Sequence, residues 1–194
     1  MKDFSVRPYY LPRLPREYYQ ADAIVHWTLT VFDRVQGWLN EAFHARFREL
    51  MLHTAAREGL FCPAYCLMPD HLHLVWMGLR PDTDQLNGMA FLRTHLEPAL
   101  APAQFQPQAH DHVLRHEERG RDAFMASVAY DLQNPVLKGL AARPEDRPFT
   151  GCVAPGYPTF HPLEDGFWPK FWKLYVAQRD VACDRHILPP LSGS

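Results

Sequence analysis

The sequence predicts an α+β fold of the ferredoxin-like type, in which helices pack on an antiparallel sheet. Segments with alternating apolar side chains are interspersed with segments of helical periodicity, in the order strand, helix, strand, strand, helix, strand, helix. The chain has 194 residues, 47% of them hydrophobic, which suits one domain with a sizeable core. Because no apolar run approaches the ~20 residues that span a bilayer, and the N-terminus lacks an apolar leader, we expect a cytoplasmic protein with no membrane contact.

The first elements follow an irregular N-terminal arm. Residues 1–20 are rich in Pro, Arg and Tyr. Residues 23–33, AIVHWTLTVFD, alternate apolar and polar side chains, which predicts a strand with one buried face. Residues 40–59 have apolar side chains on one helical face, and we expect this helix to be capped by Asn40 and to end before Gly59.

The remaining elements alternate in the same way between strand and helix patterns. They are two strands within 60–78 separated at Pro69 and Asp70, a helix at 82–100, a short strand at the end of 103–116, a helix from Asp122 to Asn134, and a terminal helix at 167–180. A proline disfavours helical geometry in the residue before it, so Pro135 predicts the end or a kink of the helix at Asn134.

Polar side chains interrupt the second of the two strands within 60–78, after Pro69, where a hairpin corner or a strand edge fits. In YCLMPDHLHLVW (65–76), an Asp and two His lie within an otherwise apolar run. Alternate side chains of a strand point to opposite faces, so His71 and His73 point the same way. Two neighbouring imidazoles are either partly exposed histidines of a sheet face or the start of a metal site.

The third helix carries a tyrosine opposite its apolar stripe. Phe124, Val128 and Leu132 follow each other at four-residue spacing and predict the buried face. Tyr130 lies about 200° round the helix from Val128, and Asn134 lies one turn beyond Tyr130. The spacing fits a surface tyrosine with an asparagine at the helix end. It also fits a nucleophile beside an oxygen ligand of a metal that the two histidines hold.

Together, these motifs resemble a known family. MPDHLHLV followed by YDLQNPVLKG is similar to the single-tyrosine HUH transposases, specifically the REP-associated tyrosine transposase group. HUH denotes His–hydrophobic–His, here His71 and His73 around a leucine, and the tyrosine stands four residues before an Asn-Pro-Val, as Tyr130 does. The segments QPQAHDHVLR (106–115) and GYPTFHP (156–162) are also similar to the family's pattern.

The resemblance divides the chain into two parts. Residues 1–162 would form an HUH endonuclease-like domain with an N-terminal arm, and 163–194 a C-terminal extension to which the family assigns no role. We expect the aromatic tail to pack back on the domain or on another subunit. The resemblance leaves open whether the protein is a monomer or a homodimer.

The chemistry that the resemblance implies is cleavage and joining of single-stranded or hairpin DNA. Tyr130 would attack a phosphodiester and form a 5′-phosphotyrosine, in two reversible steps that suit strand transfer. A divalent cation, Mg²⁺ or Mn²⁺, would be held by His71, His73 and Asn134, and Asp70 would orient an imidazole. A nearby cation favours the phenolate and withdraws charge from the phosphate oxygens.

Contacts with DNA must come from local patches. The chain has 20 Lys and Arg against 22 Asp and Glu, a net charge of −2, whereas a phosphate-binding protein usually has a basic excess. Arginine binds phosphate and aromatic rings stack on unpaired bases. The candidates are Arg7, Tyr9, Tyr10, Arg13 and Arg16 in the arm, and Arg46 and Arg48 on the first helix. The arginines of the helix are equally explained as a solvated face.

Two other functions fit these residues. One is a domesticated relative that binds a structured DNA repeat without cutting it. The other is a metal-dependent hydrolase that uses the two histidines with a carboxylate. A tyrosine transposase would need Tyr130 for cleavage. The repeat-binding protein would not cleave at all, and the hydrolase would cleave without Tyr130.

Overall fold

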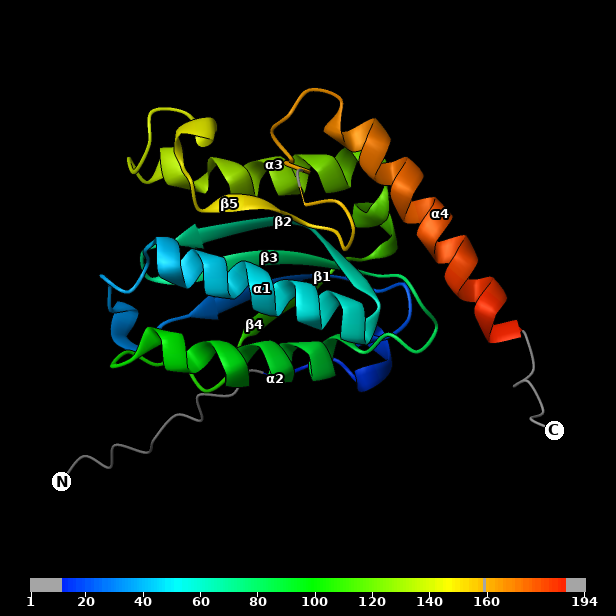
Figure 1. Ribbon diagram of the computed structural model, residues 1–194, viewed down its shortest axis with the longest axis horizontal. Coiled ribbons are helices and arrows are strands. Elements are labelled where there is room, and N and C mark those ends of the chain that lie inside the picture. Colours follow the sequence, from blue (N-terminus) through cyan, green and yellow to red (C-terminus); the bar gives the residue numbers. More distant parts are fainter. Residues whose placement is uncertain (1–11, 159, 188–194) are drawn as a thin grey trace.

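The computed structural model describes residues 12–158 and 160–187 (Figure 1). Its centre is an antiparallel sheet of five strands in the order β4-β1-β3-β2-β5, which confirms the predicted α+β class. The strands are β1 (Ile24–Thr30), β2 (Leu60–Met68), β3 (His71–Gly78), β4 (His110–Val113) and β5 (Thr150–Val153). The two strands expected within 60–78 are β2 and β3, which form a hairpin that turns at Pro69 and Asp70.

Within the described residues, four α-helices cover the sheet, on both of its faces. They are α1 (Glu41–Glu58), α2 (Gln85–Leu96), α3 (Arg121–Leu137) and α4 (Phe167–Ile187). The predicted caps of α1 are confirmed, because the Asn40 side chain accepts a hydrogen bond from the Phe43 amide and Gly59 is left-handed with φ of 63°. Helix α2 is shorter than predicted because Asp84 caps its start and a 3₁₀ turn follows Leu96.

The first six elements follow the ferredoxin-like order. The chain runs β1-α1-β2-β3-α2-β4, and these four strands lie in the order β4-β1-β3-β2. The later elements α3, β5 and α4 extend this unit, with β5 added beside β2. Among the helices that the structure describes, none combines the length and apolarity needed to cross a membrane.

The two sheet faces build separate cores. Helices α1 and α2 lie on one face, where Trp27 and Trp76 are fully buried. Helices α3 and α4 belong to the opposite face (Figure 1), where Phe124 packs with Phe171. The predicted apolar stripe of α3 is confirmed, because Phe124, Val128 and Leu132 are all at most 2% exposed. Residues that alternate along β1 and β3 therefore contribute to two different layers.

Helix α3 continues past its proline. We predicted that the helix ends or kinks at Asn134, but it runs through Pro135 to Leu137, so the predicted end is wrong. A proline cannot donate to the carbonyl four residues earlier, which here belongs to Asp131. The Asn134 side-chain nitrogen donates to that carbonyl at 3.2 Å instead. This substitute hydrogen bond and the burial of the Pro135 ring explain why the last turn persists.

The C-terminal segment packs back on the domain, the first of the two arrangements that we expected. Helix α4 is longer than the predicted 167–180, and its Phe171 and Tyr175 are buried. The Tyr175 hydroxyl donates to the carbonyl oxygen of Gly78 at 2.9 Å. The segment after residue 162 therefore supplies part of the core beneath α3.

Candidate active site

The two motif histidines converge from strand β3. In the sheet register, His73 lies opposite Thr28 of β1 and His71 opposite Thr30. The leucines that alternate with them, Leu72 and Leu74, belong to the core under α1 and α2, so both imidazoles point to the other face. Their Nε2 atoms lie 3.0 Å apart.

Polar partners on the far side of each ring fix this orientation. The His71 Nδ1 atom donates to Asp70 Oδ1 at 2.6 Å, and the His73 Nδ1 atom lies 3.2 Å from Thr28 Oγ1. Burial would raise the pKa of Asp70, but hydrogen bonds from His71 and Arg34 outweigh it and hold that pKa below its ordinary value. An ionised Asp70 accepts from His71 Nδ1, which turns the lone pair of Nε2 toward His73.

The spacing of the two nitrogens fits a divalent cation. Ligands about 2.1 Å from an octahedral ion lie roughly 3 Å apart at adjacent positions. The observed 3.0 Å between the two Nε2 atoms matches this value. Without a proton or a cation between them, the two lone pairs would repel each other at this distance.

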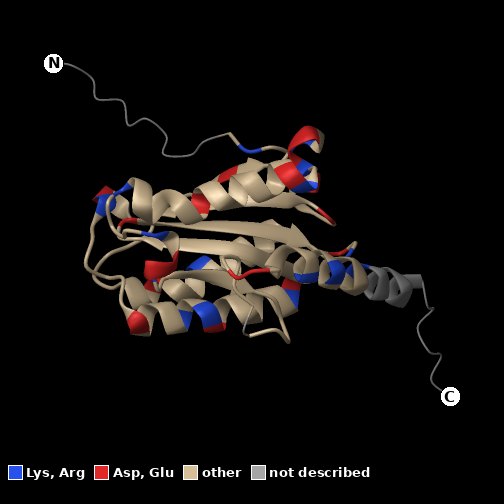
Figure 2. Cartoon of the chain, turned by 90° about the horizontal axis from the view of Figure 1, so that it is seen from above, with Lys and Arg blue, Asp and Glu red and all other residues tan. Residues whose placement is uncertain are grey.

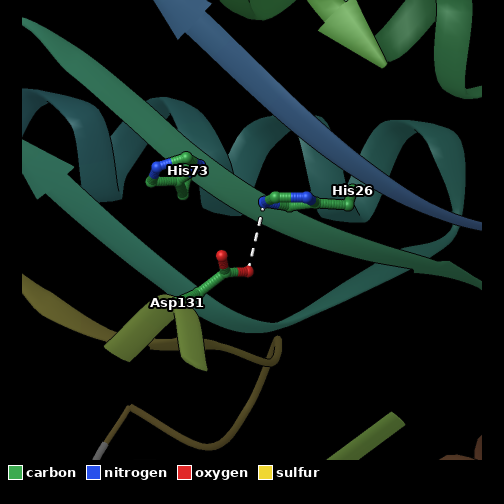
Figure 3. A group of neighbouring side chains, drawn as sticks. All are labelled: His26, His73 and Asp131. Carbon is green, nitrogen blue, oxygen red and sulfur yellow. Dashed lines mark ion pairs between the residues drawn. The ribbon is translucent and has the colours of Figure 1, made fainter. Parts of the chain in front are cut away.

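A second group of side chains lies beside His73 (Figure 3). His26 of β1 stacks on His73 with ring centroids 5.3 Å apart, and its Nε2 lies 3.1 Å from Asp131 Oδ2 of α3. One ligand atom from each of His26, His73 and Asp131 lies within 4.8 Å of the others. Three elements of the fold thus bring two imidazoles and one carboxylate together, a group that could hold a metal.

Burial shifts the protonation of this group. Burial raises the pKa of Asp131 to about 7. Burial, aided by His112 and His110, lowers the pKa of His26 to about 4, and burial aided by His71 and His26 lowers the pKa of His73 to about 3. His26 Nε2 and Asp131 Oδ2 are close, but their angles are not those of a hydrogen bond, so neither atom has a hydrogen-bond partner.

Tyr130 faces solvent. The whole residue is 63% exposed, whereas the next residue, Asp131, is 5% exposed as a whole and faces the sheet. Asn134 is half-buried, and its side-chain nitrogen is used by the carbonyl of Asp131, which leaves the amide oxygen for a ligand. Among the described residues, the structure joins Asp70, His71 and His73, and no hydrogen bond or ion pair joins Tyr130 or Asn134 to them.

The predicted DNA contacts are engaged within the protein or lie outside the described residues. Arg7, Tyr9 and Tyr10 belong to the part of the chain that is not described. Each of the other four candidates has a partner: Arg13 pairs with Asp111 at 2.9 Å, Arg16 with Asp84 at 2.7 Å, Arg46 with Glu49 at 2.8 Å, and Arg48 donates to the Tyr65 hydroxyl at 2.8 Å. Figure 2 shows basic and acidic residues interspersed over the elements in view.

The sequence interpretation did not include His26 and Asp131 in the site. Asp131 follows Val128 by three residues and precedes Leu132, so a carboxylate stands on the apolar face of α3, a signal that was available. His26 belongs to the polar face of β1, but only the pairing of β1 with β3 places it beside His73. The register between distant strands is not readable from local periodicity.

The fold and this site define an α+β protein with a histidine-bearing sheet face under a tyrosine-bearing helix. No protein-family model matches the sequence, and no curated protein is similar to it at a significant level. The fold is similar to that of a REP-associated tyrosine transposase solved in complex with a REP hairpin, with a TM-score of 0.60 and 21% identity over 72% of this chain and 82% of that chain.

A second solved structure shows a weaker likeness. It is a protein from Deinococcus radiodurans named as a transposase, with 15% identity over 62% of this chain and 98% of that chain. Its TM-score of 0.41 carries no argument about fold or function.

Proposed function

We propose that this protein is a metal-dependent endonuclease and strand transferase of single-stranded DNA, in the manner of a transposase that acts on hairpin-forming strands. The observation that carries the proposal is the convergence of His71 and His73, 3.0 Å apart, on the sheet face that the Tyr130 helix covers. The similarity in fold to a transposase bound to a hairpin supports the same reaction class.

The proposed cation is Mg²⁺ or Mn²⁺, with His71, His73 and the amide oxygen of Asn134 as ligands. Such an ion would withdraw charge from a bound phosphodiester and favour the phenolate. Asp70 orients the His71 ring through the hydrogen bond of 2.6 Å, which would direct the Nε2 lone pair to the ion.

Tyr130 is the proposed nucleophile. Its phenolate oxygen attacks the phosphorus atom, the bond from phosphorus to the 3′ oxygen breaks, and that oxygen leaves as a 3′-hydroxyl after taking up a proton. The 5′ phosphate remains on the tyrosine until the hydroxyl of another strand end attacks it, which restores the phenol and joins the strands. The exposure of Tyr130 supports attack on a strand that approaches from solvent.

The proposed contacts with DNA are the arm and the first helix. Arg13, Arg16, Arg46 and Arg48 would exchange carboxylate or hydroxyl partners for phosphates, and Arg7, Tyr9 and Tyr10 would contact the strand from the arm. The Arg46–Glu49 pair is exposed on both sides, at 43% and 53%, so this exchange costs the fold little at Arg46. Arg16 is 53% accessible but its partner Asp84 is only 8% accessible, so release of Arg16 leaves that carboxylate to Gln20 and the amides of Leu86 and Asn87.

A binder of structured repeat DNA that does not cut is the second candidate. It is favoured by the observation that Asp131, rather than Tyr130, faces the histidines. Such a protein would use the same arginines and the same hairpin but would form no covalent intermediate.

A covalent-adduct assay tests the proposal. Wild type, Tyr130→Phe and the control Tyr157→Phe, which removes another exposed hydroxyl, are mixed with hairpin oligonucleotides and Mn²⁺. We expect a denaturation-resistant adduct with wild type and the control and none with Tyr130→Phe. Binding without an adduct in wild type favours the non-cleaving binder. Cleavage that survives Tyr130→Phe favours a metal-dependent hydrolase.

A further inference from the structure

Asp131 is a buried carboxylate without a hydrogen bond to its Oδ2 atom. Its side chain is 8% exposed and lies between the apolar residues of α3 and the sheet. An ionised carboxylate is strongly disfavoured in such surroundings unless a cation or several donors compensate it. Among the described side chains, the one ion pair of Oδ2 is with His26 at 3.1 Å, in a geometry that does not form a hydrogen bond.

The unpaired atoms face a common point. His26 Nε2 is also buried without a hydrogen-bond partner, and Figure 3 shows its ring and the Asp131 carboxylate directed toward one another beside His73. The three ligand atoms lie within 4.8 Å of one another, although β1, β3 and α3 contribute one residue each. Ligands of one octahedral ion lie about 3 to 4 Å apart, so small side-chain movements complete the site.

We propose that His26 and Asp131 are ligands of a divalent cation that they share with His73. The site then extends from the motif histidines to the underside of α3. Two imidazole nitrogens and one carboxylate oxygen suit Mn²⁺ and Zn²⁺ better than Mg²⁺, which prefers oxygen ligands and retains its water. The role of the ion in DNA cleavage rests on the proposed function. Binding of the ion does not, because it is measured without catalysis.

Binding of the ion would tie α3 to the sheet. Asp131 directly follows Tyr130 on the helix, so a ligand bond from its carboxylate fixes the turn that carries the nucleophile. The cation would thus position Tyr130 through the backbone of α3, and removal of the ion would loosen this helix. If His26 and Asp131 were only a structural pair, the position of α3 would not depend on a metal ion.

Calorimetric titration of the full chain with Mn²⁺ tests the inference, together with the unfolding temperature in Mn²⁺ and in chelator. The variants are Asp131→Asn, which keeps the shape of the side chain, and His26→Phe, which keeps the ring stacked on His73. The control is Asp122→Asn, which removes an exposed carboxylate from the same helix. We expect wild type and the control to bind Mn²⁺ equally. Both site variants should raise the Kd at least about tenfold and lose most of the Mn²⁺-induced rise in unfolding temperature.

The inference is overturned if wild type binds no Mn²⁺, or if either site variant that folds in chelator binds Mn²⁺ with the wild-type Kd. If Asp131→Asn fails to fold, His26→Phe decides. Failure of this ligand assignment can be told apart from failure of the proposed function. Adduct formation with unchanged Mn²⁺ affinity in both variants retains the function and removes these ligands. Asp131-dependent Mn²⁺ binding without any adduct retains the ligands and removes the function.

Discussion

At the scale of single residues, the molecule buries several polar side chains whose protonation depends on folding. On the sheet face opposite the site, the Tyr65 hydroxyl donates to His44 Nε2 at 2.8 Å and accepts from Arg48 at 2.8 Å. Burial, aided by Arg48, lowers the pKa of His44 to about 4. A protonated His44 would lose its acceptor atom and would face a guanidinium, so the fold requires it neutral.

This arrangement predicts a dependence of stability on pH. The unfolded chain binds the His44 proton near pH 6.5, and the folded protein binds it near pH 4. The contribution of this residue is therefore complete above about pH 6.5 and is lost as the pH falls toward 4. We expect His44→Gln to make the free energy of unfolding fall less steeply than in wild type between pH 7 and pH 4, measured by urea titration. Equal slopes in the two proteins would contradict the assignment.

Residue patterns also explain how much of the site was predictable. Alternation along one strand is enough to place His71 and His73 on the same face, and Asp70 precedes them in the chain. The neighbourhood of His26 depends on the pairing of two strands about 45 residues apart, which local sequence does not encode. The apolar stripe of α3 includes Asp131, but the spacing of Tyr130 and Asn134 favoured a site on the exposed face of the helix.

At the scale of elements, the end of α3 depends on one side chain. The Asn134 amide replaces the hydrogen bond that Pro135 cannot donate to the carbonyl of Asp131. This gives Asn134 a structural role that is separate from its proposed role as a ligand. The pattern of caps and breakers predicted both ends of α1 and the starts of α3 and α4. It missed the end of α3, where a side chain substitutes for a backbone donor.

A double-mutant cycle measures this role. Asn134→Ala should destabilise the wild-type fold by about 0.5–1.5 kcal/mol, the net value of one hydrogen bond. In a Pro135→Ala background the backbone amide of residue 135 supplies the donor, so the same change should cost less, with a coupling of at least about 0.5 kcal/mol. Chemical denaturation of the four proteins in chelator gives the cycle without a metal contribution. Additive effects would show that the side chain does not replace the missing donor.

At the scale of the whole molecule, the balance of charge limits the proposed contacts with DNA. The net charge is −2, and three of the four described candidate arginines pair with acidic side chains, while Arg48 pairs with a tyrosine hydroxyl. The fold class was predictable because the sheet has helices on both faces. Successive side chains of β1 and β3 alternate between the two cores, and each core contacts a different pair of helices. Composition alone did not reveal that α4 completes the second core.

Few phosphate contacts predict a weak dependence of affinity on salt. The five proposed arginines on a single strand give a slope of about −3.5 for the logarithm of the binding constant against the logarithm of salt concentration. Arg46→Ala should make this slope less negative by about 0.7, measured by fluorescence anisotropy with a labelled hairpin. A slope steeper than about −6 would contradict this limited set of contacts.

The most direct test of the central claim is the mass of the peptide that carries residue 130 after reaction with hairpin DNA and Mn²⁺. Wild-type protein is denatured, treated with nuclease and protease, and analysed for a nucleotide attached through phosphate. We predict the added mass on the peptide of Tyr130, at the hydroxyl of that residue. An adduct on another tyrosine, or DNA cleaved with no modified peptide, would contradict a mechanism that uses Tyr130 as the nucleophile.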